Sequence, residues 1–336
     1  FRIFTALKKE GVTIILITHK LHEIISITDN VSVMRGGKMV AHRQTSKTNR
    51  EDLAELMVGR KVLLQVSKDE KIRGEVLLKV SNLSVRDSNN IDRLNDISFE
   101  IHAGEIVGIA GVSGNGQSTL LKVLSGITPV SSGAIEILGH KMDADNLIYP
   151  DQLRELGLAH VPEDRQRMGL IGNFSASETS IIGYHNDKRI NNKLILNNSK
   201  VRENCKNLMS DFDVRPGNPD LRSDNFSGGN QQKLIVAREF ERDPKILLIG
   251  QPTRGVDIGA IEFIHKRIIA LRDSGRAVLL VSVELEEIMS ISDRIVVLCD
   301  GQVSGRIDSK DADEKTLGMM MANVFNKEDN LEALSS

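Results

Sequence analysis

Tryptophan is absent from the 336 residues of this chain, and aromatic residues of all kinds make up only 3%. Cysteine is almost absent too: Cys205 and Cys299 lie far apart and form no C-x-x-C pair. This usage fits free structural thiols in a reducing compartment better than a disulfide or a cysteine metal site. No apolar run approaches the roughly 18 residues that a membrane-spanning helix needs. The sequence therefore predicts a chain that does not itself cross a membrane.

An excess of charge of either sign is also lacking, since 44 Lys and Arg stand against 46 Asp and Glu, for a net charge of -2. This balance gives no global electrostatic signal for a nucleic-acid partner or for coating a membrane surface. The apolar content of 40% is enough to build an ordinary buried core. Function must therefore come from local sites on a globular fold.

The chain begins at Phe1, without an initiator methionine or a signal peptide, so we expect the start of the encoded protein to be missing. An internal repeat supports this expectation, because residues 6–59 and 270–323 align without a gap. Each copy is expected to contain a helix, a buried strand (13–17 and 277–281), a second helix, a strand with a glycine turn, and a short amphipathic helix. The offset between the copies is as long as a whole domain and too long for a solenoid repeat.

The repeat predicts four segments of the chain. Residues 1–60 are expected to be the end of a first module, and residues 76–325 a complete second module. Between them, residues 61–75 are mixed and charge-rich, which favours a linker over an extra structured element. Residues 326–336 are predicted to be a frayed tail.

A glycine-rich stretch, Glu105–Leu121 (EIVGIAGVSGNGQSTLL), joins an apolar run to a helical pattern. Its spacing fits G-x-x-x-x-G-K-[ST] at Gly111, Gly116 and Ser118, except that Gln117 replaces the lysine. Backbone N–H groups of such a loop and the helix that follows cradle phosphates. Taken alone, the pattern fits a tight strand-to-helix turn equally well, so the motifs downstream decide its meaning.

The segment 225–233 (NFSGGNQQK) opens a second predicted helix. The hydroxyl of Ser227 and the N–H groups of Gly228 and Gly229 are suited to bind an anion at the helix N-terminus, although a plain helix cap would use the same residues. The segment 245–257 (KILLIGQPTRGVD) then reads as a buried strand that ends in a polar turn.

This order of motifs resembles that of the ATP-binding cassette ATPases. The segments GNGQS, VPEDRQRMGL, SGGNQQK and QPTRGVD are similar to the second cassette of tandem-cassette ATPases of bacterial simple-sugar and nucleoside importers. The resemblance implies an α/β P-loop NTPase fold, with a RecA-like mixed sheet core, an antiparallel β subdomain and a helical subdomain. It also implies ATP and Mg²⁺ as cofactors.

The resemblance assigns roles to individual residues. Gly250 stands where the magnesium-holding aspartate is expected, Gln251 where the catalytic glutamate is expected, and Val283 at the switch-histidine position. Glu163 stands where the family usually has a glutamine. These departures predict a phosphate loop that does not hydrolyse ATP efficiently. The residues expected to bind ATP are Gly111, Gly114, Asn115, Gly116, Gln117, Ser118, Thr119 and Glu163, and Ser118 is also the expected metal ligand. The signature consists of Ser227, Gly228, Gly229, Asn230 and Gln231, and Asp257 is assigned to the cassette interface. The catalytic positions are Gln251 and His19, the switch histidine of the first module.

Cassettes of this family pair head to tail, so the signature of one cassette completes the phosphate site of the other. The intact signature at 227–231 would then serve the phosphate loop of a first cassette, and this chain alone is expected to hydrolyse ATP poorly. The resemblance also implies that permease subunits in a bacterial membrane dock near 163–183, with the ATPase on the cytoplasmic face of that membrane. A solute-binding protein would be an indirect partner, and no nucleic-acid partner is expected. A soluble cassette ATPase acting on ribosomes or DNA is the alternative, which the balanced charge disfavours.

Residues 174–224 read as a polar helical layer.

Overall fold

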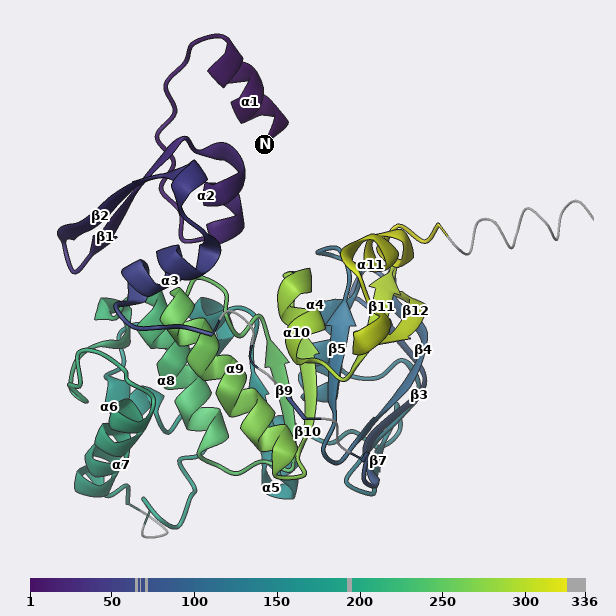
Figure 1. Ribbon diagram of the computed structural model, residues 1–336. Helices are drawn as coiled ribbons and strands as arrows, with labels where there is room; N and C mark the ends of the chain where they lie inside the picture. Colours follow the sequence, from purple (N-terminus) through teal and green to yellow (C-terminus); the bar gives the residue numbers. More distant parts are fainter. Residues whose placement is uncertain (64–65, 67, 70–71, 192–194, 325–336) are drawn as a thin grey trace, which may run out of the picture. The chain divides into compact units, whose positions relative to one another are not determined.

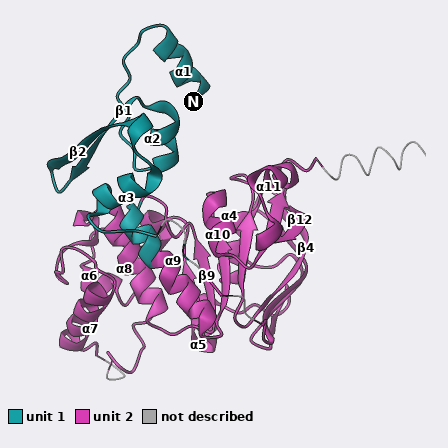
Figure 2. Cartoon of the chain, in the orientation of Figure 1, with its two compact units in different colours: residues 1–67, 256–263 teal, residues 68–255, 264–336 magenta. Residues whose placement is uncertain are grey.

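Two units make up the part of the chain that this computed structural model describes, which is residues 1–63, 66, 68–69, 72–191 and 195–324. Unit 1 comprises residues 1–67 and 256–263, and unit 2 comprises residues 68–255 and 264–336 (Figure 2). The predicted tail at 326–336 lies outside the described residues, as do several positions of the predicted linker at 61–75.

A mixed sheet forms the centre of unit 2. Its strands are β5 (Ile106–Ala110), β8 (Leu158–Val161), β9 (Ile246–Gly250), β10 (Ala277–Val281), β11 (Arg294–Cys299) and β12 (Gln302–Asp308), in the spatial order β12-β11-β5-β10-β9-β8. The pair β11 and β12 is antiparallel, and all other neighbours are parallel. Every residue of β5, β9 and β10 is buried, as expected for parallel strands that are covered on both faces.

An antiparallel sheet forms a second layer of unit 2. Its strands are β3 (Val76–Arg86), β4 (Asp92–His102), β6 (Ser132–Ile137) and β7 (His140–Met142), in the order β4-β3-β6-β7. Alternate residues of β3, such as Leu78 and Val80, are buried, because successive side chains of a strand point to opposite faces. They share one core with Leu120, Leu124 and Leu279 of the mixed-sheet layer.

Helices complete unit 2. The helices α6 (Ala176–Thr179) and α7 (Asn198–Asp211) lie on the side of the mixed sheet away from the antiparallel sheet (Figure 1). The predicted polar helical layer at 174–224 is confirmed for α6 and α7, while much of the remainder is turn and loop. The helices are α4 (Gln117–Leu124), α5 (Pro150–Leu156), the π-helical turn η2 (Arg165–Gly169), α6 (Ala176–Thr179), α7 (Asn198–Asp211), η3 (Ser223–Asn225), α8 (Gly228–Phe240), α9 (Ile258–Asp273), α10 (Leu285–Ile291), η4 (Ser309–Asp311) and α11 (Glu314–Met321). The first residues of α9, up to 263, belong to unit 1. The predicted combination of mixed sheet, antiparallel sheet and helical layer is thus confirmed.

Unit 1 contains α1 (Arg2–Lys9), α2 (Leu21–Ile27), β1 (Asn30–Arg35), β2 (Lys38–Gln44), η1 (Thr45–Lys47) and α3 (Arg50–Val58). From α2 onward its elements correspond one by one to α10, β11, β12, η4 and α11 of the repeat. The detail extends to a β-bulge after Val33 and after Val297, and to the helix caps Asn49 and Asp313, whose side chains accept from the N–H three residues later. The repeat seen in sequence is therefore also a structural repeat.

One predicted strand is wrong. Residues 13–17 form no strand, and Ile15 and Ile17 are 88% and 96% exposed. Their counterpart β10 is fully buried because it pairs with β5 on one side and β9 on the other. No described residue pairs with 13–17 in this way, and a strand without neighbours leaves its backbone hydrogen bonds to water.

Candidate functional site

Four parallel strands of unit 2 end at the same edge of the mixed sheet. Val281 of β10 is in register with Ile109 of β5 and with Gly250 of β9, and Val161 of β8 is in register with Ile249. The loops that follow these strands carry the predicted phosphate loop, Glu163, Gln251 and the turn at Val283. Open α/β sheets bind ligands at this carboxyl edge.

The predicted phosphate loop connects β5 to α4. Gly114 and Gly116 have φ angles of 98° and 105°, in the region that favours glycine. A Cβ on Gly116 would lie 2.7 Å from Cδ2 of Leu94 and 3.0 Å from the carbonyl oxygen of Arg93, so no side chain fits there. Ser118 is exposed in the first turn of α4, followed by the half-buried Thr119. This strand, glycine turn and helix have the local form needed to hold a phosphate.

Gln117 turns back into this loop. Its Nε2 donates to the carbonyl oxygen of Val112 at 3.2 Å, and the residue is 5% exposed. A Cβ on Gly111 would lie 2.3 Å from that Nε2 atom, so the amide packs directly against the loop's first glycine. The position that carries lysine in P-loops is therefore occupied by a neutral side chain bonded to the loop's own backbone.

Gly250, the last residue of β9, lies against the loop that follows β8. A Cβ on Gly250 would lie 2.4 Å from Cγ of Glu163 and 2.8 Å from Cδ1 of Leu121. The side chain of Glu163 thus occupies the space that any longer residue at position 250 would need. The structure brings these two predicted positions into direct contact.

Gln251 follows with a φ of 50°, an uncommon value for a residue with a side chain. Its N–H donates to the carbonyl oxygen of Val281 at 2.7 Å, and its Oε1 accepts from the N–H of Val283 at 3.4 Å. Both bonds tie the turn after β9 to the end of β10. Because an amide does not take up a proton near neutral pH, this side chain cannot act as a general base.

The predicted signature begins α8. Ser227 is the N-cap of this helix, and its Oγ accepts from the side-chain Nδ2 of Asn230 at 2.9 Å. Gln231 is buried and donates from Nε2 to the carbonyl oxygen of Ser223 at 2.9 Å, while its Oε1 accepts from Gln166 at 2.8 Å. These bonds fix the first turn of α8, whose free N–H groups and positive dipole end favour an anion.

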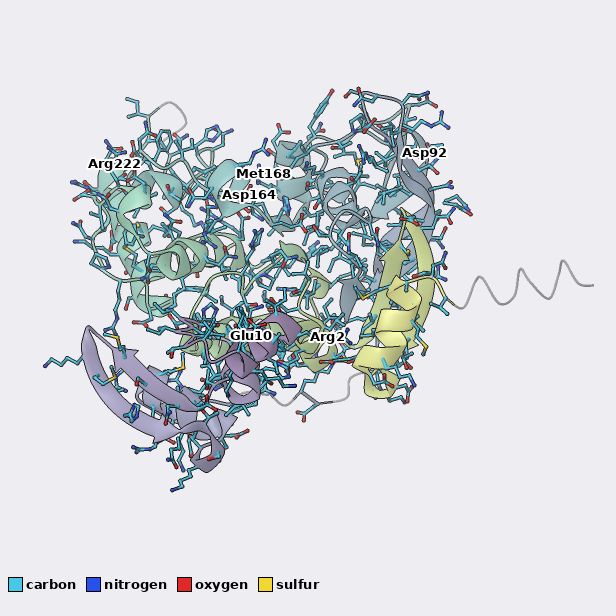
Figure 3. All side chains as sticks on the ribbon, turned by 90° about the horizontal axis from the view of Figure 1, so that it is seen from above. Arg2, Glu10, Asp92, Asp164, Met168 and Arg222 are labelled. Carbon is cyan, nitrogen blue, oxygen red and sulfur yellow. The ribbon has the colours of Figure 1, made fainter. Side chains whose placement is uncertain are left out.

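Arg165 is a neighbour of the signature that the sequence analysis did not single out. A Cβ on Gly228 would lie 2.5 Å from Nη2 of Arg165, and Nη1 donates to the carbonyl oxygen of Arg254 at 2.8 Å. Its position in the VPEDRQRMGL segment, two residues after Glu163, was the available sequence signal. Asp164 and Met168, labelled in Figure 3, belong to the same turn, where the N–H of Met168 donates to the carbonyl oxygen of Asp164.

Two predicted residues lie in unit 1. His19 is exposed, directly before α2. Asp257 is exposed as well, and its Oδ1 accepts from the N–H of Ala260 at 2.9 Å, which caps the start of α9.

Three further observations concern the part of the chain that the structure describes. Among the described residues, no group of three or more His, Cys, Asp or Glu side chains is placed to hold a metal ion. The helices of the described part include none that combines the length and the apolar character of a membrane span. Both predicted free cysteines, Cys205 and Cys299, are buried and unbridged.

Residues 94–254, which include the phosphate loop, Glu163, the signature and Gln251, match the family model described as ABC transporter. These residues have the P-loop NTPase fold of the ABC ATPases. The chain is 41% identical over 320 residues to the nucleoside import ATP-binding protein NupA of Lactococcus lactis, and 41% identical over 327 residues to the guanosine import ATP-binding protein NupO of Bacillus subtilis. It is 36% identical over 318 residues to the ribose import ATP-binding protein RbsA of Clostridium tetani.

The alignments cover 95%, 97% and 94% of this chain but only 63%, 64% and 61% of NupA, NupO and RbsA. Solved cassettes share the fold. One, a dimeric structure of the bacterial ABC transporter cassette MJ0796, aligns over 69% of this chain and 98% of its own with a TM-score of 0.59 and 23% identity. Another, the cassette MJ1267, aligns over 73% of this chain and 98% of its own with a TM-score of 0.61 and 18% identity.

Proposed function

We propose that this chain is part of an ATP-binding subunit that couples ATP binding and hydrolysis to the import of a simple sugar or nucleoside through membrane permeases. The names of its relatives, which specify nucleoside, guanosine and ribose import, support this proposal. In this arrangement residues 1–60 are the end of a first cassette, 61–75 a linker, and 76–325 a complete second cassette, followed by a tail at 326–336.

The observation that carries the proposal is a contrast between two phosphate-binding elements of unit 2. At the phosphate loop, Gln117 is neutral and bonded to Val112, Gly250 has no carboxylate, and Gln251 is an amide. At the start of α8, by contrast, Ser227 and two glycines leave an intact helix N-terminus. The second cassette therefore serves chiefly as a donor of its signature to the phosphate loop of the first cassette, while its own site is catalytically degenerate.

Magnesium is proposed as the ion that accompanies ATP. In the degenerate site the exposed hydroxyl of Ser118 is the ligand that remains, and Glu163 supplies the nearest carboxylate to Gly250. This donor set is poor for a cation that prefers several oxygen ligands in octahedral geometry. We therefore assign no hydrolytic step to the metal in the second cassette.

Pairing with the other cassette would be head to tail, with His19 at the productive site and Asp257 near the interface. The permease subunits would contact the helical layer near 163–183, where Met168 and Ile171 are 39% and 44% exposed. A solute-binding protein would act on the permeases from the other side of the membrane. The subunit would then sit peripherally on the cytoplasmic face of a bacterial membrane.

A soluble cassette ATPase that acts on ribosomes or DNA is the other class of function. The near-neutral net charge of -2 argues against it, because nucleic-acid binding leaves a basic surface. We favour the importer because each of the three curated relatives reported above is named for import.

ATP hydrolysis by the purified chain tests the proposal. We expect turnover far below the 1 s⁻¹ or more that is usual for enzymes, because Gln251 cannot polarise the attacking water. Turnover of about 1 s⁻¹ or faster that the substitution Ser118→Ala abolishes would show a competent site in the second cassette. That result would overturn the division of labour.

A further inference from the structure

Arg165 lies at the N-terminus of α8, where positive charge is unfavourable. Its Nη2 is the atom that a Cβ on Gly228 would meet at 2.5 Å, so the guanidinium lies beside the first turn of the signature helix. The N-terminus of a helix carries a partial positive charge from its unpaired N–H groups. A cation held there without compensation raises the free energy of the fold.

Charges of both signs surround Arg165, and the positive charge of Arg254 has the larger effect on it. Partial burial, followed by the charge of Arg254, lowers the pKa of Arg165, while Asp164 acts in the opposite direction. The carboxylate of Asp164 already accepts from the N–H groups of Gln166 and Arg167. The buried Nε atom of Arg165 has no hydrogen-bond partner among the described residues.

The geometry keeps the guanidinium in place all the same. Nη1 donates to the carbonyl oxygen of Arg254 at 2.8 Å, and a Cβ on Gly255 would lie 3.5 Å from Nη2. Glycines at 228 and 255 thus leave room for Arg165 between the signature helix and the turn after β9. The Nη2 end of the guanidinium therefore lies beside the N-terminus of α8, and a cationic donor next to free backbone N–H groups is the chemistry that binds a phosphate.

We propose that Arg165 is a further phosphate-binding residue of the signature half-site. Together with the Ser227 hydroxyl and the N–H groups of Gly228 and Gly229, it receives the terminal phosphate of the nucleotide that the other cassette holds. This inference rests on the proposed function, since it deepens the role of the same half-site. An arginine suits this task because its planar donors can make two hydrogen bonds to one phosphate.

Inorganic phosphate titrated into the whole chain at constant ionic strength tests the proposal. With ¹⁵N-labelled glycine, the amide signals of Gly228 and Gly229 report the signature half-site, and those of Gly114 and Gly116 report the phosphate loop. We expect saturable shifts at Gly228 and Gly229. Arg165→Gln should weaken this binding roughly tenfold or more, because it removes a charge-assisted contact, and Arg165→Lys should recover part of it.

Arg167→Ala is the matched control, because it removes an equal charge from the same exposed turn; it should leave phosphate binding unchanged. A glutamine at position 165 can still donate to the carbonyl oxygen of Arg254. If the Arg165→Gln variant binds phosphate as tightly as the wild type, Arg165 only holds the turn in place by that hydrogen bond, and the inference is overturned. Unchanged signals of Gly114 and Gly116 in the variant establish that it is folded. If Gly228 and Gly229 do not respond even in the wild type, the signature half-site of the proposed function fails as well.

Discussion

A Cβ atom on Gly250 would lie 2.4 Å from Cγ of Glu163, so these two residues share one volume at the carboxyl edge of the mixed sheet. Under this arrangement an aspartate at position 250 and the present side chain at position 163 exclude each other. The two departures from the family pattern are therefore parts of one packing relationship. Neither departure is an isolated change.

Gly250→Asp should consequently destabilise the chain. Forcing a larger side chain into a filled space costs about 1–3 kcal/mol, and shortening the neighbour with Glu163→Ala should return part of that loss. Urea unfolding of both single variants and the double variant measures the coupling between the two sites. Gly217→Asp is the control, since nothing lies within 4 Å of a Cβ there; strictly additive effects at 250 and 163 would disprove the shared volume.

Gln117→Lys should strengthen nucleotide binding without restoring hydrolysis. A lysine ammonium in the phosphate loop adds a charge-assisted contact, for a gain of roughly tenfold in the affinity for a fluorescent ATP analogue. Hydrolysis should stay low because Gly250 and Gln251 remain. Gln302→Lys adds the same charge at an exposed position and should change nothing. An unaltered affinity of the Gln117→Lys variant would mean that position 117 does not reach the nucleotide.

His160 should make the fold sensitive to acid. Burial, and secondarily the charges of Arg154 and Arg238, lower the pKa of His160 to about 4, and its Nε2 atom is buried without a partner. Between pH 6.5 and 4 the unfolded chain binds a proton that the folded chain does not, so stability falls as the pH is lowered through this window.

The expected loss from this one group is about 2 kcal/mol between pH 7 and pH 5, and it rises to about 3 kcal/mol near pH 4. Urea unfolding at pH 7 and pH 5 measures it, and His160→Gln should flatten the dependence relative to the wild type. His140→Gln, at an exposed position of β7, serves as the control and should leave the dependence as it is. Equal slopes for the wild type and the His160 variant would contradict the assignment.

The two copies of the repeat should respond differently to the same truncation. Leu279→Ala opens a cavity in the core that the two sheets of unit 2 share and should cost about 2–5 kcal/mol. Ile15→Ala, at the equivalent position of unit 1, should change stability by no more than about 0.5 kcal/mol, because Ile15 is 88% exposed. Thermal and urea unfolding compare them directly. A large loss from Ile15→Ala would show that this segment is paired in solution.

Much of this protein could be predicted from the residues alone. The β-branched run at 106–110, the glycines that follow it and the SGG cap at 227–229 gave strand, loop and helix in their observed places. These features are local: a buried strand, a left-handed glycine and a helix cap depend on residues within a few positions of one another. For the same reason α2, β1, β2 and α3 could be read from the repeat.

Only the tertiary structure decided what depends on distant partners. The run at 13–17 has the composition of β10, yet it forms no strand, since a strand needs neighbours and β10 finds them in β5 and β9. The contacts of Glu163 with Gly250 and of Arg165 with Gly228 join residues far apart in the chain. The sequence by itself determined the fold, the order of its motifs and which charges are missing from the phosphate loop. The structure decided which side chains fill the space those charges left, because that depends on packing between segments that no local pattern encodes.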